Sequence, residues 1–139
     1  MTSLPPVHTQ SDLLAVWRQL MEPLGFGGSS VWMLRIQPDR AVVPQVVEIA
    51  EVEGPPEPDL TESFAEVLRL LDQDDPGHAY AFLRSRPGTG TADHTDRAWA
   101  AFLYDAGRVA GVGVEVVHLA TDADVVPLPL DEIGLGRTA

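Results

Sequence analysis

The chain contains no cysteine, no lysine and no asparagine, and no apolar run in it is as long as a membrane span. Without cysteine it forms neither disulfides nor a thiolate zinc site, and it gives no sign of an oxidising compartment. The first residues, Met1 to Pro6, lack the basic and apolar regions of a signal peptide. We therefore expect a cytoplasmic protein that does not associate with a membrane.

Positive charge is scarce, because 9 basic residues, all arginine, stand against 21 acidic ones, giving a net charge of -12. The imbalance is greatest between residues 48 and 75, where Arg69 is the only base among these acids: Glu48, Glu51, Glu53, Glu57, Asp59, Glu62, Glu66, Asp72, Asp74 and Asp75. Such a surface repels phosphate backbones, which argues against nucleic-acid binding. It is more typical of a solvated acidic face than of a docking surface for a basic partner.

The length of 139 residues fits one domain over 1–139 with a single hydrophobic core. We expect an amino-terminal helix and linker over 1–28, a core over 29–133 and a tail over 134–139. Possible caps at Thr9 and Ser11 precede a helix that ends near Pro23, with apolar residues at helical spacing: Leu13, Leu14, Trp17, Leu20 and Met21. This helix packs on its own sheet or, as the alternative, on a neighbouring molecule.

Two segments rich in β-forming residues, 30–36 and 41–49, flank the turn sequence 37–40 and predict an antiparallel hairpin, with Pro44 at an edge or a bulge. A proline-rich connector over 54–58 follows. Asp59 and Glu62 then have the spacing of a capping box at the start of a second helix. The apolar stripe of that helix is Phe64, Val67, Leu68 and Leu71.

The segment 78–84 alternates as a strand, with Tyr80, Phe82, Arg84 and Arg86 on one side. A third helix is predicted over 93–109 and stops near 111–113; its buried side is Trp99, Phe102, Leu103, Ala106 and Val109. Strands over 114–120 and 125–128 complete the order α-β-β-α-β-α-β-β. The fold class is therefore α/β, or α+β-like: a mixed sheet of about five strands covered by three helices.

Two short runs that follow this order carry a family resemblance. Arg84-Ser85-Arg86-Pro87-Gly88 ends the third strand, and Asp93-x-x-Asp96 opens the next helix. With one residue missing from the loop, they resemble the His-x-His-Pro-Ser-Gly and Ser-x-x-Asp runs of the JAB/MPN metalloprotease-like domain, above all its bacterial RadC-like branch. The resemblance extends from Ser30 to about Ile133 and implies a JAB/MPN-like core.

The resemblance also implies where the chemistry of the family has been lost. Family zinc is held by two imidazoles and one carboxylate, leaving one position for water, and a glutamate from the second strand is the base. Arg84 and Arg86 stand at the imidazole positions, and a guanidinium has no lone pair to donate. The base position falls near Gln45, and Glu48 reaches it only if the hairpin shifts by three residues. We expect no metal, no cofactor and no protease activity, with Asp96 as a relic or a first-turn acid.

Arg84 and Arg86 also suggest an anion site, because they emerge from one face of a strand near the amino-terminus of a helix. The candidate residues for a small anion or a carboxylate ligand are Arg84, Arg86, His94, Asp96 and Arg97. The simpler interpretation is that the arginines pair with Asp93 and Asp96. No His-x-x-x-His pair, Walker motif or nucleophile pattern occurs in the sequence.

Two hypotheses follow. The first is a non-catalytic interaction or scaffold module that binds a protein partner or forms a homo-oligomer through its first helix or an exposed strand edge. The second is a ligand binder or hydrolase that uses the arginine cluster. Arginines paired with Asp93 or Asp96, beside an apolar patch elsewhere, favour the first hypothesis, and unpaired arginines in a pocket favour the second. The replaced zinc ligands lead us to the first.

Overall fold

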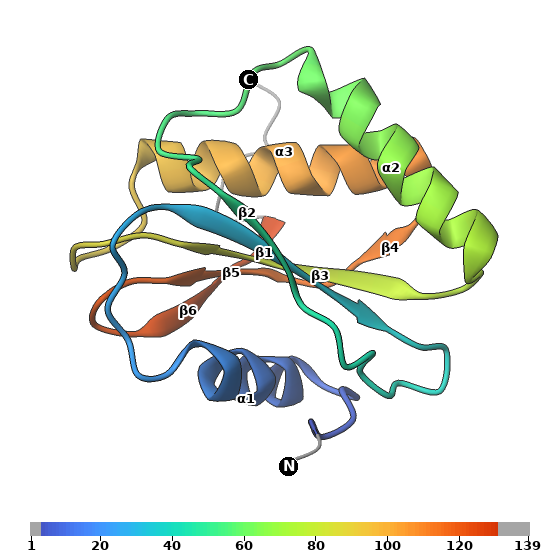
Figure 1. Ribbon diagram of the computed structural model, residues 1–139, viewed down its shortest axis with the longest axis horizontal. Helices are drawn as coiled ribbons and strands as arrows, with labels where there is room; N and C mark the ends of the chain where they lie inside the picture. The colour runs from blue at the N-terminus through green and yellow to red at the C-terminus, as the bar shows by residue number, and fades with distance from the viewer. Residues whose placement is uncertain (1–3, 131–139) are drawn as a thin grey trace.

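The chain forms three layers in a computed structural model that describes residues 4–130 (Figure 1). Helix α1 covers one face of a mixed six-stranded sheet, and α2 and α3 cover the other face. The predicted class, a mixed sheet covered by helices, is confirmed. The predicted tail over 134–139 and the end of the predicted core lie outside the described residues. The elements are α1 (Gln10–Met21), β1 (Ser30–Ile36), β2 (Val47–Ala50), α2 (Leu60–Asp74), β3 (Ala79–Ser85), α3 (His94–Ala110), β4 (Gly113–Val114), β5 (Val117–Ala120) and β6 (Val125–Leu128).

The sheet has the strand order β2-β1-β3-β5-β6, and β4 pairs with the start of β3. Strand β3 runs parallel to β4 and β5, and the other pairs are antiparallel. The pairing is parallel because α3 crosses over the sheet and returns the chain to the end of the sheet at which β3 began. The predicted strand over 114–120 is thus divided into β4 and β5. Strands β2 and β6 form the two edges of the sheet.

Helix α1 begins at a capping box and packs against the sheet with its apolar side. The Asp12 N–H donates to Thr9 Oγ1 at 3.1 Å, and the Thr9 N–H donates to Asp12 Oδ2 at 3.0 Å. Of the two possible caps, Thr9 is therefore confirmed, and Ser11 lies inside the helix. Leu13 and Trp17 are fully buried against this face, where inward residues of the neighbouring strands include Leu34 and Leu83. The helix therefore covers the sheet of its own chain.

The opposite face carries the second part of the core under α2 and α3. The predicted alternation of β3 is confirmed, since Tyr80 and Phe82 belong to this part and Ala81 and Leu83 to the α1 part. Helix α3 is capped at its start by Asp93 and at its end by Gly111, whose φ of 76° is the left-handed conformation that favours glycine. The ends of α3 are therefore close to those predicted.

Three local predictions were wrong. Strand β2 begins at Val47, because the residues after the turn make only one bridge, Ile36 with Val42, before the chain rejoins β1. Asp59 makes no side-chain cap, since its own backbone is already helical at φ −77° and ψ −6°. Val67 is 49% exposed, because α2 turns that side of its stripe away from the core. No helix among residues 4–130 is long and apolar enough to cross a membrane.

Candidate site: a buried arginine and aspartate cluster

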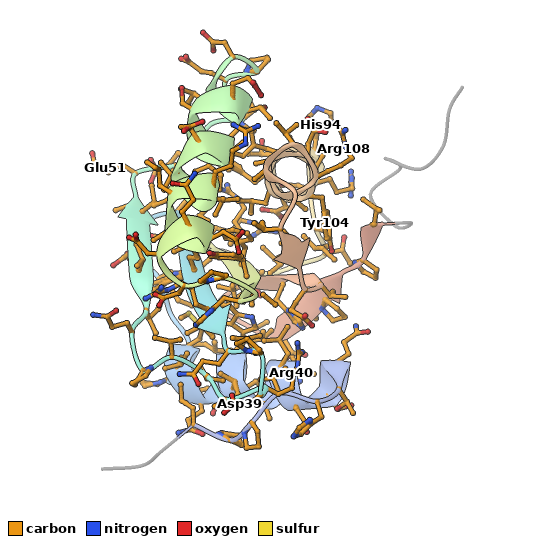
Figure 2. All side chains as sticks on the ribbon, turned by 90° about the vertical axis from the view of Figure 1, so that its right-hand side faces the viewer. Asp39, Arg40, Glu51, His94, Tyr104 and Arg108 are labelled. Carbon is orange, nitrogen blue, oxygen red and sulfur yellow. The ribbon has the colours of Figure 1, made fainter. Side chains whose placement is uncertain are left out.

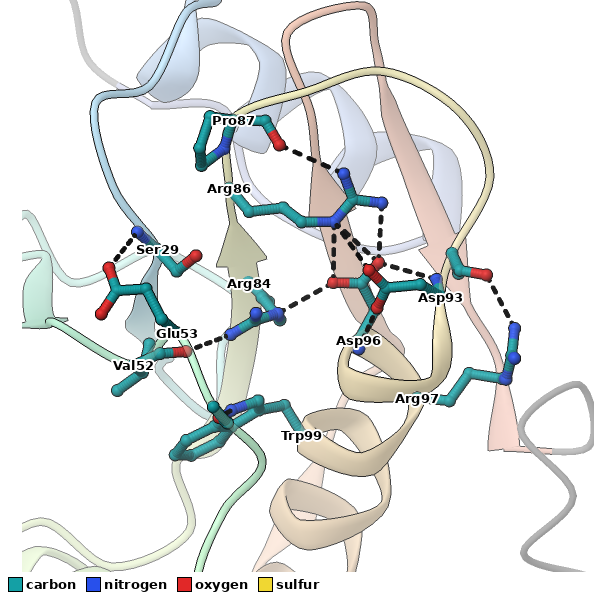
Figure 3. Close-up of polar contacts among 12 residues, drawn as sticks. Ser29, Val52, Glu53, Arg84, Arg86, Pro87, Asp93, Asp96, Arg97 and Trp99 are labelled. Atoms are coloured by element: carbon teal, nitrogen blue, oxygen red, sulfur yellow. Dashed lines mark hydrogen bonds and ion pairs between the residues drawn. The ribbon is translucent and has the colours of Figure 1, made fainter.

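Arg84, Arg86 and Asp96 meet at the end of β3 (Figure 3). Arg84 Nε lies 2.9 Å from Asp96 Oδ1, and Arg86 Nε lies 2.9 Å from each Asp96 oxygen. Arg86 Nη2 makes a further contact of 2.8 Å with Asp96 Oδ2. Asp93 is farther away, 3.9 Å from Arg86 Nε. Both arginines are therefore paired, chiefly with one shared carboxylate.

Local structure explains why these side chains converge. Arg84 and Arg86 are two residues apart, so both project from the same side of the chain, towards α3. Asp96 is held by a capping box at the start of α3, in which its N–H donates to Asp93 Oδ1 at 2.8 Å and the Asp93 N–H donates to Asp96 Oδ2 at 2.9 Å. One carboxylate thus caps the helix and pairs with the strand.

The cluster keeps Asp96 ionised although the residue is fully buried. Burial alone would raise the pKa of Asp96, but hydrogen bonds from Arg86, the Asp93 N–H and Arg84 together lower it below its usual value. The same hydrogen bond to Asp96 raises the pKa of Arg86 and outweighs the opposing effect of burial. Asp96 and Arg86 are therefore both charged across the whole physiological pH range.

Backbone carbonyls occupy further donors of the two arginines. Arg84 Nη1 donates to the Val52 carbonyl at 2.7 Å, so the segment after β2 closes over the cluster. Arg86 donates to the carbonyls of Pro87 and Thr91, both at 3.2 Å. A small anion at this position would have to compete with Asp96 and with these carbonyls for the guanidinium groups.

The other two candidate anion-site residues lie apart from the centre of the cluster. The His94 side chain is exposed, and within residues 4–130 no hydrogen bond or ion pair joins it to Arg84 or Arg86. Arg97 Nη1 donates to the Ala92 carbonyl at 2.7 Å. The structure therefore brings together three of the five candidate residues. An anion site built from all five stays a hypothesis.

The donor set at this position does not fit zinc, because two of the three side chains are guanidinium groups without lone pairs. In the part of the chain that the structure describes, no group of three or more His, Asp or Glu residues is arranged to hold a metal ion. Neither candidate base reaches the cluster. Gln45 Oε1 lies 3.5 Å from Arg35 Nη2, near the far end of β1, and Glu48 accepts a hydrogen bond of 2.7 Å from Ser30.

Two cavities on either side of β2 were not predicted from the sequence. The apolar groove has a volume of about 250 Å³ and lies on the α2 and α3 face, lined by Val31, Ile49, Leu60, Ser63, Phe64, Val67, Trp99, Phe102 and Leu103. The acidic pocket has a volume of about 430 Å³ and is lined by residues 25–30 with Trp32, Glu48, Ala50, Glu51, Glu53 and Ser85. The alternation of apolar and acidic residues over Val47-Glu48-Ile49 was the available signal.

Fold and site together define a three-layer α/β domain with a buried, charge-paired cluster where the third strand meets the third helix. Comparison with known proteins adds no relative: no family model, no curated protein and no solved structure matches this chain.

Proposed function

We propose that this chain is a non-catalytic, metal-free protein-interaction module, a degenerate relative of the bacterial RadC-like branch of JAB/MPN domains. The carrying observation is the contact of Arg84 and Arg86 with Asp96, the three residues that the resemblance assigns to the zinc-ligand positions. Two guanidinium groups supply the positive charge that a carboxylate at this place requires. The absence of cysteine fits a cytoplasmic setting.

Surface composition supports the interaction role. Several large apolar side chains are exposed on β2 and α2: Val47, Ile49, Leu60, Val67 and Leu70. Of these, Ile49, Leu60 and Val67 line the apolar groove. Exposed apolar residues grouped in this way are typical of a binding surface. The guanidinium groups of the paired arginines, by contrast, already donate to Asp96 and to the Val52 carbonyl, so they have few hydrogen-bond donors left for a ligand. The geometry therefore favours the interaction module over the anion binder or hydrolase.

Metal analysis tests the non-catalytic part of this proposal. Protein purified without chelator is expected to contain no zinc, and a calorimetric titration with zinc is expected to show no stoichiometric binding. The matched comparison is the Asp96→Ala variant, because Asp96 is the only carboxylate in contact with both arginines within hydrogen-bonding distance among the described residues. Stoichiometric zinc in the wild type that disappears in this variant would return the chain to hydrolase chemistry.

A restoration variant tests the family resemblance separately. Replacing both arginines, Arg84→His with Arg86→His, recreates two imidazoles and one carboxylate at the family positions. If the resemblance is right, this double variant gains stoichiometric zinc while the wild type has none. Far-UV circular dichroism establishes that the variant is folded. A folded double variant without zinc affinity would remove the family assignment and leave the interaction role to be tested through its partner.

A further inference from the structure

Strand β2 is an open edge of the sheet. It pairs with β1 on one side, and no described residue pairs with its other side. All four of its residues are exposed, and Figure 2 shows the strand at the outer limit of the molecule beside α2, with Glu51 just beyond its end. Edge strands usually carry a device that prevents pairing with another chain. Here the strand itself has two apolar residues, Val47 and Ile49, at 47% and 41% exposure.

The two faces of β2 differ in chemistry. Val47 and Ile49 are paired in register with Met33 and Val31, which belong to the core under α2 and α3, so their side chains lie on that face of the sheet. Ile49 also lines the apolar groove. Glu48 alternates with them and faces the acidic pocket. A strand added beyond β2 would place its own side chains alternately over these two cavities. Its apolar residues would continue the groove, and its other residues would meet carboxylates.

The negative charge of the acidic pocket determines which partner residues fit the Glu48 face of β2. Glu48, Glu51 and Glu53 line the acidic pocket, and Trp32 forms part of its wall with its indole N–H donating to Ser85 at 2.9 Å. Arginine or lysine side chains fit such a pocket, since carboxylates pair with the charge and an indole face attracts a cation. The acids of α2 extend the same negative field around the apolar groove.

A second copy of this chain is a poor occupant of the edge. In an antiparallel pair of β2 strands related by a twofold axis, the acidic faces of the two copies would lie on the same side of the joined sheet. Glu48 of one copy would then stand near Glu48 of the other, and like charges across strands are destabilising. Each copy also carries a net charge of -12. The partner therefore has the opposite charge.

We infer that β2 binds an extended segment of a partner protein in which apolar and basic residues alternate, by addition of that segment to the sheet edge. Main-chain hydrogen bonds to β2 provide affinity, and the two cavities select the side chains. This inference rests on the proposed interaction role and names its surface and partner class. It is independent of whether the chain descends from zinc hydrolases.

Synthetic peptides test the inference by fluorescence anisotropy with the full chain. The probe peptide alternates valine and arginine, and its first control has the same composition with the valines and arginines in separate blocks. A second control carries N-methyl groups on alternate amides, which removes donors from any added strand. The alternating peptide is expected to bind at least about tenfold more tightly than either control, the scale of one well-placed interaction.

Charge-reversal variants locate the binding surface. Glu48→Arg is expected to weaken binding of the alternating peptide by about tenfold or more, in line with the loss and reversal of a close charge pair. The matched control is Asp74→Arg, which changes the net charge equally but lies at the far end of α2, away from both cavities. Its effect is expected to be small and to disappear as salt screens the long-range field.

Four other outcomes of these experiments would overturn the inference. Equal affinity for the alternating and block peptides would show attraction to the negative surface alone. Equal affinity for the N-methylated peptide would exclude strand addition, and equal effects of Glu48→Arg and Asp74→Arg would exclude this edge. A stable dimer whose β2 amides are protected from hydrogen exchange without peptide would assign the edge to a second copy. None of these results depends on the zinc analysis, so each proposal fails separately.

Discussion

Arg84 and Asp96 form an ion pair in the protein interior, with Nε and Oδ1 2.9 Å apart and side chains only 3% and 0% exposed. A buried carboxylate is costly to desolvate, and this one is compensated by Arg84, by Arg86 and by the Asp93 N–H. The pair connects the last residues of β3 to the first turn of α3. The ion pair that forms the candidate site therefore also holds β3 and α3 together.

Loss of the carboxylate charge is predicted to be severely destabilising. Asp96→Asn keeps the shape of the side chain but removes the carboxylate charge that pairs with buried Arg84, and it leaves Arg86 with only Asp93 at 3.9 Å. Removing one partner of a buried pair costs about 3–5 kcal/mol. Urea unfolding followed by circular dichroism measures the change. The control is Asp105→Asn, which breaks the exposed pair with Arg108 and is expected to cost less than about 1 kcal/mol. Equal effects of the two variants would contradict the interior role of Asp96.

The convergence of this cluster was predictable because its parts are local. Alternation along β3 places Arg84 and Arg86 on one side, and the acidic spacing after residue 92 places Asp96 in the first turn of α3. Sequence periodicity was equally informative for α1 and for the end of α3 at Gly111. In each case the signal lies within a few residues of the structure that it specifies.

Long-range contacts were less predictable. The Val52 carbonyl that binds Arg84 comes from a segment 32 residues earlier, and its position depends on how the chain leaves β2. The late start of β2 at Val47 also depends on the path of the chain. The left-handed conformation of Arg40 and the single bridge at Val42 determine where the chain rejoins β1. Neither feature has a local pattern. The edge position of β2, and with it the two cavities, follows from the strand order alone.

Two of the candidate helix caps, Thr9 and Asp59, are predicted to differ in their contribution to stability. Thr9→Ala removes a side-chain acceptor that binds the Asp12 N–H, so we expect a loss of about 1 kcal/mol in the free energy of unfolding. Asp59→Ala removes a side chain that makes no cap hydrogen bond, so we expect a change of no more than about 0.5 kcal/mol. Chemical denaturation of the two variants side by side measures the difference. A larger loss for Asp59→Ala would contradict the helical backbone at that residue.

Close packing of α3 on β4 gives a third prediction. A Cβ atom added at Gly107 would lie 2.2 Å from Val114 Cγ2, much closer than any van der Waals contact. Gly107→Ala should therefore destabilise the protein by about 1–3 kcal/mol, as overpacked sites do, although alanine is the better helix former by about 1 kcal/mol. Thermal unfolding measures the net effect. The double variant with Val114→Ala relieves the contact and should recover part of the loss; no recovery would place the strain elsewhere.

A buried histidine on β5 predicts a pH dependence of stability. His118 is fully buried, and burial lowers its pKa to about 4, while a contact of 3.0 Å between Nδ1 and the Val116 carbonyl opposes this shift. Its Nε2 has no hydrogen-bond partner among the described residues, and it lies beside a small pocket lined by the uncharged residues Gln10, Ser11, Leu14 and Pro127. The folded protein therefore holds the neutral imidazole.

Because the folded pKa lies below the unfolded value of about 6.5, the unfolded chain takes up the proton first as the pH falls. Stability should be independent of this group above about pH 6.5 and should decrease between about pH 6.5 and pH 4, by a total of about 3 kcal/mol. Asp96, whose pKa is lowered, titrates below this window. His118→Gln keeps a donor for the Val116 carbonyl and cannot titrate, so urea unfolding at a series of pH values should show a flatter profile than the wild type. If the His118→Gln profile is as steep as that of the wild type, the pH dependence comes from another group.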